Sequence, residues 1–100
     1  MSMEIGSLYQ TENCSLLLFP TFEYACSFHA WQAQSNAVLY GLDLYLSRNP
    51  SVSKLNSNTV LVPLEKRQAS VDRCYKVITQ DGNIGWIVLI YHDIERMKKL

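Results

Sequence analysis

Short apolar runs separated by turn-forming residues make up most of the chain. In several of them apolar and polar positions alternate, which is the period-two pattern of a half-buried β-strand. The clearest case spans residues 38–47, where Leu42, Leu44 and Leu46 fall on one face and Asp43 and Tyr45 on the other. Strands are predicted at residues 5–10, 15–20, 38–47, 58–67, 74–79 and 84–91.

Two prolines and one polar stretch set limits within this pattern. Proline has no N–H to donate to a strand ladder, so it belongs at strand ends, edges and bulges. Pro20 therefore ends the second predicted strand, and Pro63 indicates an edge or a bulge in the fourth. The stretch 47–51, SRNPS, has the composition of a turn.

The pair Asp81-Gly82 between two apolar runs is the strongest local signal in the chain. Tight hairpin turns need a positive φ, which glycine adopts freely and which Asp and Asn tolerate. Residues 74–79 and 84–91 are therefore predicted to pair as an antiparallel hairpin. Gly85, inside the second of these strands, fits a place where two backbones approach each other closely.

Two segments have a less decided pattern. In residues 24–36, Tyr24, Phe28 and Trp31 have near-helical spacing, but the same residues fit a long, bent β-hairpin arm. In the tail, residues 92–100, Asp93 could cap a helix and the basic end suits a helix C-terminus. A short helical turn is predicted there, which must dock on the rest of the protein because it is too short to be stable alone.

Composition limits the classes of function. The chain has 100 residues, enough for a single domain over residues 1–100. Nine basic and nine acidic residues give zero formal net charge, which argues against binding nucleic acid through a basic field. Charged residues are only 18% of the chain, and a weakly charged surface favours association with other proteins.

Cysteine usage and the N-terminal sequence suggest a compartment. Cys14, Cys26 and Cys74 are an odd count at wide spacing, which is typical of reduced thiols in a cytoplasmic protein, although one bridge and one free thiol also fit. The N-terminal residues lack the basic and apolar regions of a signal peptide, and no run approaches the ~20 apolar residues that cross a bilayer. We expect a cytoplasmic protein with no membrane partner.

The second half of the chain resembles bacterial SH3-type (SH3b) domains. The resemblance is carried in order by Leu55, Val60, Val62 and Leu64, then Tyr75, Lys76 and Val77, then Asp81, Gly82, Gly85, Trp86 and Ile87. It covers residues 52–91 well and residues 5–10 loosely. It implies a small barrel with an enlarged insertion, residues 11–50, after the first strand.

The chain also departs from the SH3 pattern at the positions that bind proline-rich peptides. Cys74 stands where a tryptophan often opens the third strand, and Val88 replaces the proline of the closing turn. Recognition of PxxP peptides of the usual kind is therefore not expected.

Aromatic side chains are the candidate binding residues. The SH3 spacing implies that Tyr9 and Tyr91 lie near each other with exposed hydroxyls, which is common interface chemistry. Trp86 is either a ligand platform or a side chain packed on the barrel flank. Tyr24 and Trp31, in the insertion, are either packing residues or part of a binding surface.

Catalytic and metal chemistry find little support in the sequence. Cys26-x-x-His29 is a fragment of a metal signature, but Cys14, Cys74 and His92 are too distant in the sequence to complete a local pair. No metal and no cofactor are expected. The charges of 65–67 and of Lys98 and Lys99 are interpreted as solvated.

These observations lead to one main hypothesis and two alternatives. The main hypothesis is an all-β, small SH3-like barrel of about five strands, with an inserted hairpin or arm and a short C-terminal helical turn. We expect it to be a non-enzymatic module that binds a protein or peptide through its aromatic residues. The alternatives are a structural or accessory homo-oligomer, such as a phage or virion-associated protein, and a nucleic-acid-binding small barrel.

Overall fold

The computed structural model describes residues 3–12, 16–27, 46–69, 72–89 and 97–100. Strands dominate these residues, and two short stretches, 22–27 and 46–48, are helical. The strands are β1 (Tyr9–Thr11), β2 (Leu16–Leu18), β3 (Ser53–Leu55), β4 (Val60–Ala69), β5 (Asp72–Thr79), β6 (Ile84–Leu89) and β7 (Met97–Lys99). The prediction of a mostly β chain is confirmed.

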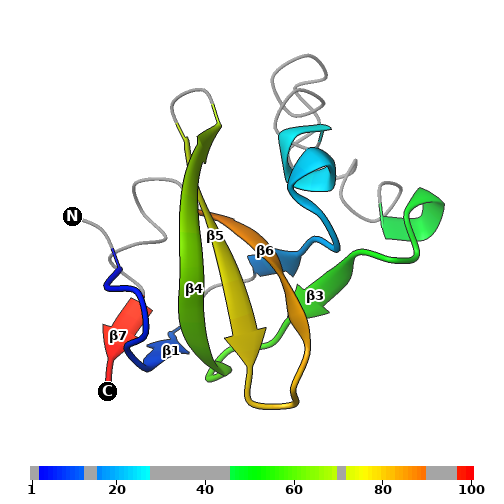
Figure 1. The fold of residues 1–100 in the computed structure, drawn as a ribbon. Coiled ribbons are helices and arrows are strands. Elements are labelled where there is room, and N and C mark those ends of the chain that lie inside the picture. Colours follow the sequence, from blue (N-terminus) through cyan, green and yellow to red (C-terminus); the bar gives the residue numbers. More distant parts are fainter. Residues whose placement is uncertain (1–2, 13–15, 28–45, 70–71, 90–96) are drawn as a thin grey trace.

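The strands form two antiparallel sheets. Five strands make an open sheet in the order β6-β5-β4-β1-β7, and β2 pairs with β3 in a separate two-stranded sheet. β1 and β7 lie on one side of the molecule, while the helical stretches lie on the opposite side (Figure 1).

The hairpin of β5 and β6 confirms the prediction made from Asp81-Gly82 and refines its turn. The N–H of Gly82 donates to the carbonyl of Thr79, and the N–H of Thr79 donates to the carbonyl of Asn83, both at 2.9 Å. Gly82 has a φ of 83°, whereas Asp81 is not among the residues with positive φ. This is the three-residue loop in which a turn is followed by a left-handed glycine.

β4 contains the irregularity predicted at Pro63. Its register with β5 shifts between Pro63, opposite Val77, and Glu65, opposite Lys76. Leu64 is the extra residue, and its side chain is 43% exposed. A bulge increases the local bend of a strand, which lets the long β4 contact β1 at one end and β5 along its length.

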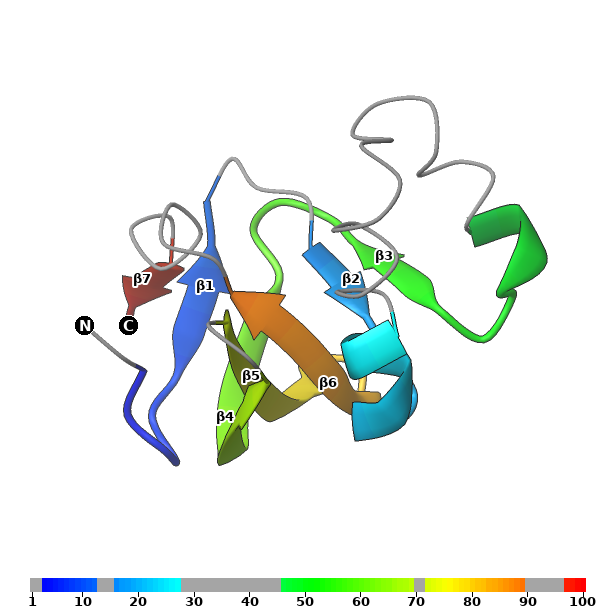
Figure 2. The ribbon, with the colours of Figure 1, turned by 90° about the horizontal axis from the view of Figure 1, so that it is seen from above.

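Two apolar cores lie on opposite faces of β6. Ile87 and Leu89 belong to the main core between the sheets, whereas Trp86 lies in a second core with Ala25. The alternation follows from the pleat of a strand, in which neighbouring side chains point to opposite faces. Helical residues 22–27, drawn in cyan beside β6, cover the second core (Figure 2).

The predicted C-terminal helical turn is wrong where the structure describes it. Residues 97–99 form β7, which pairs with β1 so that Met97 lies opposite Thr11 and Lys99 opposite Tyr9. Met97 is buried in the main core. A strand prevails because the edge of β1 supplies hydrogen-bond partners and a core contact, which a helical turn of a few residues cannot match.

Two other strand boundaries also differ from the prediction. The first strand begins at Tyr9 rather than at residue 5, because Ser7 donates its N–H to the Glu4 carbonyl in a turn and Gly6 has a φ of 86°. Leu46 and Ser47, the last residues of the strand predicted at 38–47, are helical, so the turn predicted at 47–51 is found only at its end. Residues 38–45 lie outside the described part of the chain.

Gly85 is the position where close approach leaves no room for a side chain. A Cβ there would lie 2.7 Å from the carbonyl oxygen of Phe19 and 2.8 Å from the side chain of Leu18. We expect Gly85→Ala to lower the free energy of unfolding by about 1–3 kcal/mol, the usual cost of overpacking. Urea titration monitored by circular dichroism measures this loss.

Gly82→Asn is the matched control for this substitution. Asn tolerates a positive φ, and a Cβ at Gly82 meets no atom within 4 Å, so the loss should be clearly smaller. Equal losses for the two variants would show that β2 does not approach Gly85 as described.

The position of β7 can be tested through an ion pair. Lys99 donates to the carboxylate of Glu4 at 2.6 Å, and this hydrogen bond, with one from Ser7, holds the pKa of Glu4 below its ordinary value. A carboxyl group whose pKa is lower in the folded protein than in the unfolded chain stabilises the fold at pH values above the unfolded pKa. This stability is lost as the pH falls through the folded pKa. Lys99→Ala should raise the pKa of Glu4, as measured by carboxyl NMR titration. Lys98→Ala should leave it nearly unchanged, and equal shifts would contradict the strand.

Candidate functional site

The tyrosine predicted to expose its hydroxyl in the first strand does not do so. Tyr9 is buried in the main core, with only 6% of its surface exposed. Its hydroxyl oxygen accepts a hydrogen bond from the N–H of Glu4 at 2.7 Å. The SH3 spacing suggested a position for Tyr9 but carried no information on which side chains would cover it. Tyr91, its expected partner, lies outside the described residues.

Trp86 is packed on the flank of the sheet, as one of the two interpretations proposed. It is 6% exposed, and its ring lies 5.2 Å from that of Phe22, tilted by 56°. The Arg67 guanidinium lies 5.2 Å from both ring centroids, and its Nε donates to Glu65 at 2.9 Å. The Arg67 guanidinium is therefore both exposed to solvent and packed over two aromatic rings. The ring of Trp86 makes its contacts within the molecule.

The candidates in the insertion are only partly described. Tyr24 lies on helical residues 22–27 with 36% of its surface exposed, so it remains accessible. Trp31 lies outside the described residues. So do Cys14, His29 and His92; Cys26 is half-buried and Cys74 is buried. Within the part of the chain that the structure describes, no three metal-ligating side chains gather.

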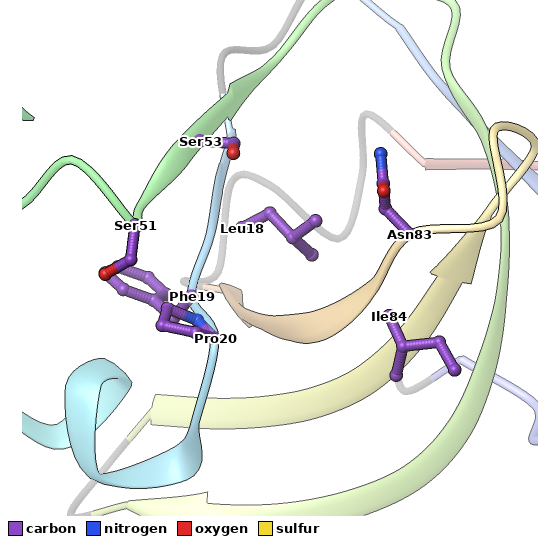
Figure 3. Close-up of a pocket in the computed structure, with 7 residues that line it drawn as sticks. All are labelled: Leu18, Phe19, Pro20, Ser51, Ser53, Asn83 and Ile84. Carbon is purple, nitrogen blue, oxygen red and sulfur yellow. The ribbon is translucent and has the colours of Figure 1, made fainter.

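A groove opens where β2 separates from the start of β6 (Figure 3). It encloses about 220 Å³. Three short segments that are distant in the sequence line it: Leu18, Phe19 and Pro20; Ser51 and Ser53; Asn83 and Ile84. In Figure 3, Leu18 points from the β2 side into the space in front of Asn83 and Ile84.

One backbone contact creates the groove. Phe19 and Trp86 exchange two hydrogen bonds, each 2.7 Å long, which fasten the end of β2 to the edge of β6. At Pro20 the chain bends and then enters helical residues 22–27. The first residue of β6, Ile84, is left beside the gap, with its side chain 55% exposed.

The described lining is uncharged and mixes polar with apolar groups, and its exposed surface is more polar than apolar. Leu18 is nearly buried at the base, whereas Ile84 and Pro20 are exposed at the sides. Ser51, Ser53 and Asn83 supply hydroxyl and amide groups, which both donate and accept hydrogen bonds. These residues can hold an apolar group and orient it by hydrogen bonds, and none of them is a charged acid or base.

The residues of the groove were not found from the sequence. Pro20 was interpreted only as the end of a strand, and Asn83 and Ile84 only as part of a hairpin. The one available signal was strand 84–89 itself, which is apolar on both faces and so predicts cover on both sides. The sequence does not show which residue of that strand is left uncovered, because this depends on where the chain after β2 turns away from β6.

Comparisons with protein-family models, with curated proteins and with solved structures give no match for this chain. Among the described residues, the helical stretches are too short to span a membrane. The interpretation of function therefore depends on the geometry and chemistry of the chain itself.

Proposed function

We propose that the chain is an SH3-like barrel domain that acts as a non-enzymatic protein- or peptide-interaction module, with the groove between β2 and β6 as its binding surface. The last strand, β7, pairs with the first, β1, which is the kind of contact that brings a small barrel toward closure. The long connection from β1 to β4 carries β2 and the helical stretches, which lie within residues 11–50, where the SH3-type resemblance places the insertion; β3 follows it.

The observation that carries the function is the character of the groove. An uncharged lining, in which hydroxyl and amide groups accompany the side chains of Leu18 and Ile84, suits part of another polypeptide. Its volume of about 220 Å³ is below the ~300 Å³ at which small-molecule and cofactor sites begin. The groove is thus better matched to part of a peptide than to a whole cofactor.

The proposal differs from the sequence-based hypothesis in the surface that binds. Tyr9 and Trp86 are occupied by intramolecular contacts, so aromatic burial by these two residues does not provide the interface. The groove replaces them as the candidate surface. Tyr24 stays available as a contact outside the groove.

A second candidate function, self-association, is favoured by a separate cluster of exposed apolar side chains. Leu100 donates its N–H to Leu8, and Gly6 donates its N–H to Pro63, so residues near both termini and the β4 bulge lie together. The cluster, which we call the terminal patch, consists of Ile5, Leu8, Leu64 and Leu100, each 43–57% exposed. Gathered exposed apolar groups of this kind mark interaction surfaces.

The groove hypothesis predicts a site-specific loss of peptide binding. Peptides selected from a display library of random heptamers should shift the amide NMR signals of Ser53, Asn83 and Ile84. We expect Ser53→Arg to weaken their binding at least about tenfold, because it places a long, charged side chain in a small, uncharged groove. Isothermal titration calorimetry measures the affinities.

Ser57→Arg is the control, since Ser57 is exposed in the turn between β3 and β4 and does not line the groove. This variant should bind like the wild type. Failure to select any peptide, or shifts confined to residues remote from the groove, would overturn the proposed binding surface.

Self-association makes a different prediction. If the terminal patch joins copies of the chain, the molar mass from light scattering should rise with protein concentration. Leu8→Glu should then return the protein to a monomer, because it places a carboxylate in the apolar contact. Ser53→Arg should leave the molar mass unchanged. A constant monomer mass up to millimolar concentration would exclude this second function.

A further inference from the structure

One backbone edge in the groove has no neighbouring strand among the residues that the structure describes. In an antiparallel pair the peptide groups of successive residues face alternate sides. Asn83 faces β5, because its carbonyl accepts from Thr79, and Trp86 faces away, toward Phe19. Ile84, two positions before Trp86, must therefore also turn its N–H and C=O away from β5. Among the described residues, no backbone hydrogen bond to Ile84 is found on that side.

The local sequence explains why this edge is uncovered. Continued past Phe19, β2 would run alongside β6 and reach Ile84. Pro20 instead begins a bend, and helical residues 22–27 follow, with the Tyr24 N–H donating to the Thr21 hydroxyl at 3.3 Å. The chain thus leaves the edge of β6 one residue pair after the Phe19–Trp86 contact.

We propose that the groove binds an extended, uncharged segment of another protein by strand addition to β6 at Ile84, with one apolar side chain of that segment covering Leu18. This inference rests on the proposed interaction function and specifies its ligand. A bound strand would pair with the outward N–H and C=O of Ile84, which have no backbone partner among the described residues, and its backbone bonds provide affinity without a particular sequence.

The lining sets the chemistry of that segment. Alternate side chains of an extended strand point in opposite directions, so the segment directs only every second side chain into the groove. A charged side chain there would lose water over Leu18 and meet only the hydroxyl and amide groups of Ser51, Ser53 and Asn83. The groove therefore selects an uncharged residue of the bound segment. The small volume of the groove leaves room for about one such side chain.

The test uses three terminally blocked heptapeptides built from threonine and glutamine. The first has leucine at its centre, the second glutamate, and the third the leucine sequence with N-methyl groups on its three central residues. Each is titrated into the ¹⁵N-labelled protein, followed by NMR, and hydrogen exchange of the Ile84 amide is measured with and without peptide.

Strand addition predicts three results together. The leucine peptide should shift the signals of Asn83 and Ile84 and slow exchange of the Ile84 amide at least about tenfold, since its N–H becomes hydrogen-bonded. The glutamate peptide and the N-methylated peptide should each bind at least about tenfold more weakly, because one loses burial and the other loses backbone donors.

The outcomes separate this inference from the function on which it rests. If library-selected peptides contact the groove but N-methylation has no effect and Ile84 exchange is unchanged, strand addition is wrong and the interaction function stands. If neither the library nor the heptapeptides perturb the groove, both are wrong. If the Ile84 signals shift with protein concentration alone, the edge is covered by a second copy of the chain, which also overturns the inference.

Discussion

The two hydrogen bonds between Phe19 and Trp86 are the constraint on which the rest of the structure depends. They are the described backbone link between the β2–β3 sheet and the five-stranded sheet. They require a glycine at 85, because any Cβ there would collide with the Phe19 carbonyl. They also set where β2 ends, since the chain must turn away at Pro20. The closing hairpin, the second core and the groove all meet at this contact.

The same contact explains how the insertion is held to the sheet. Trp86 presents one side of its backbone to Phe19 and its ring to Phe22, so strand pairing and helix packing are joined in one residue. Arg67 adds a cation over both rings. Aromatic pairs contribute about 0.5–1.5 kcal/mol beyond burial, and a half-exposed cation–π contact contributes about 0.5–1 kcal/mol. Together these contacts hold residues 22–27 on the face where Cys74 is buried.

Local signals predicted the features that neighbouring residues decide. The β5–β6 hairpin, the bulge after Pro63 and the end of β2 before Pro20 each follow from a single residue's backbone chemistry. The tail was mispredicted because its conformation is decided by pairing with β1, almost the whole chain away. The expected exposure of the Tyr9 hydroxyl came from the SH3 spacing, which could not show that the N-terminal residues around Glu4 would cover it. The groove could not be found at all, since its three lining segments meet only after β2 docks on β6.

The distribution of aromatic residues also explains why the candidate site consists mainly of aliphatic, hydroxyl and amide groups. Where the structure describes them, the largest rings are used to join elements: Tyr75 accepts from the Met3 N–H, Tyr9 accepts from Glu4, and Trp86 lies under Phe22. What remains accessible at the contact between the sheets is a short length of strand edge.

A long, flat edge would invite indiscriminate pairing with other chains. Here the bend at Pro20 and the turn at 80–83 bound the edge on both sides, so it can accept only a short segment. An edge of that length gives modest affinity, and selectivity must then come from the uncharged side chain that the groove over Leu18 can hold.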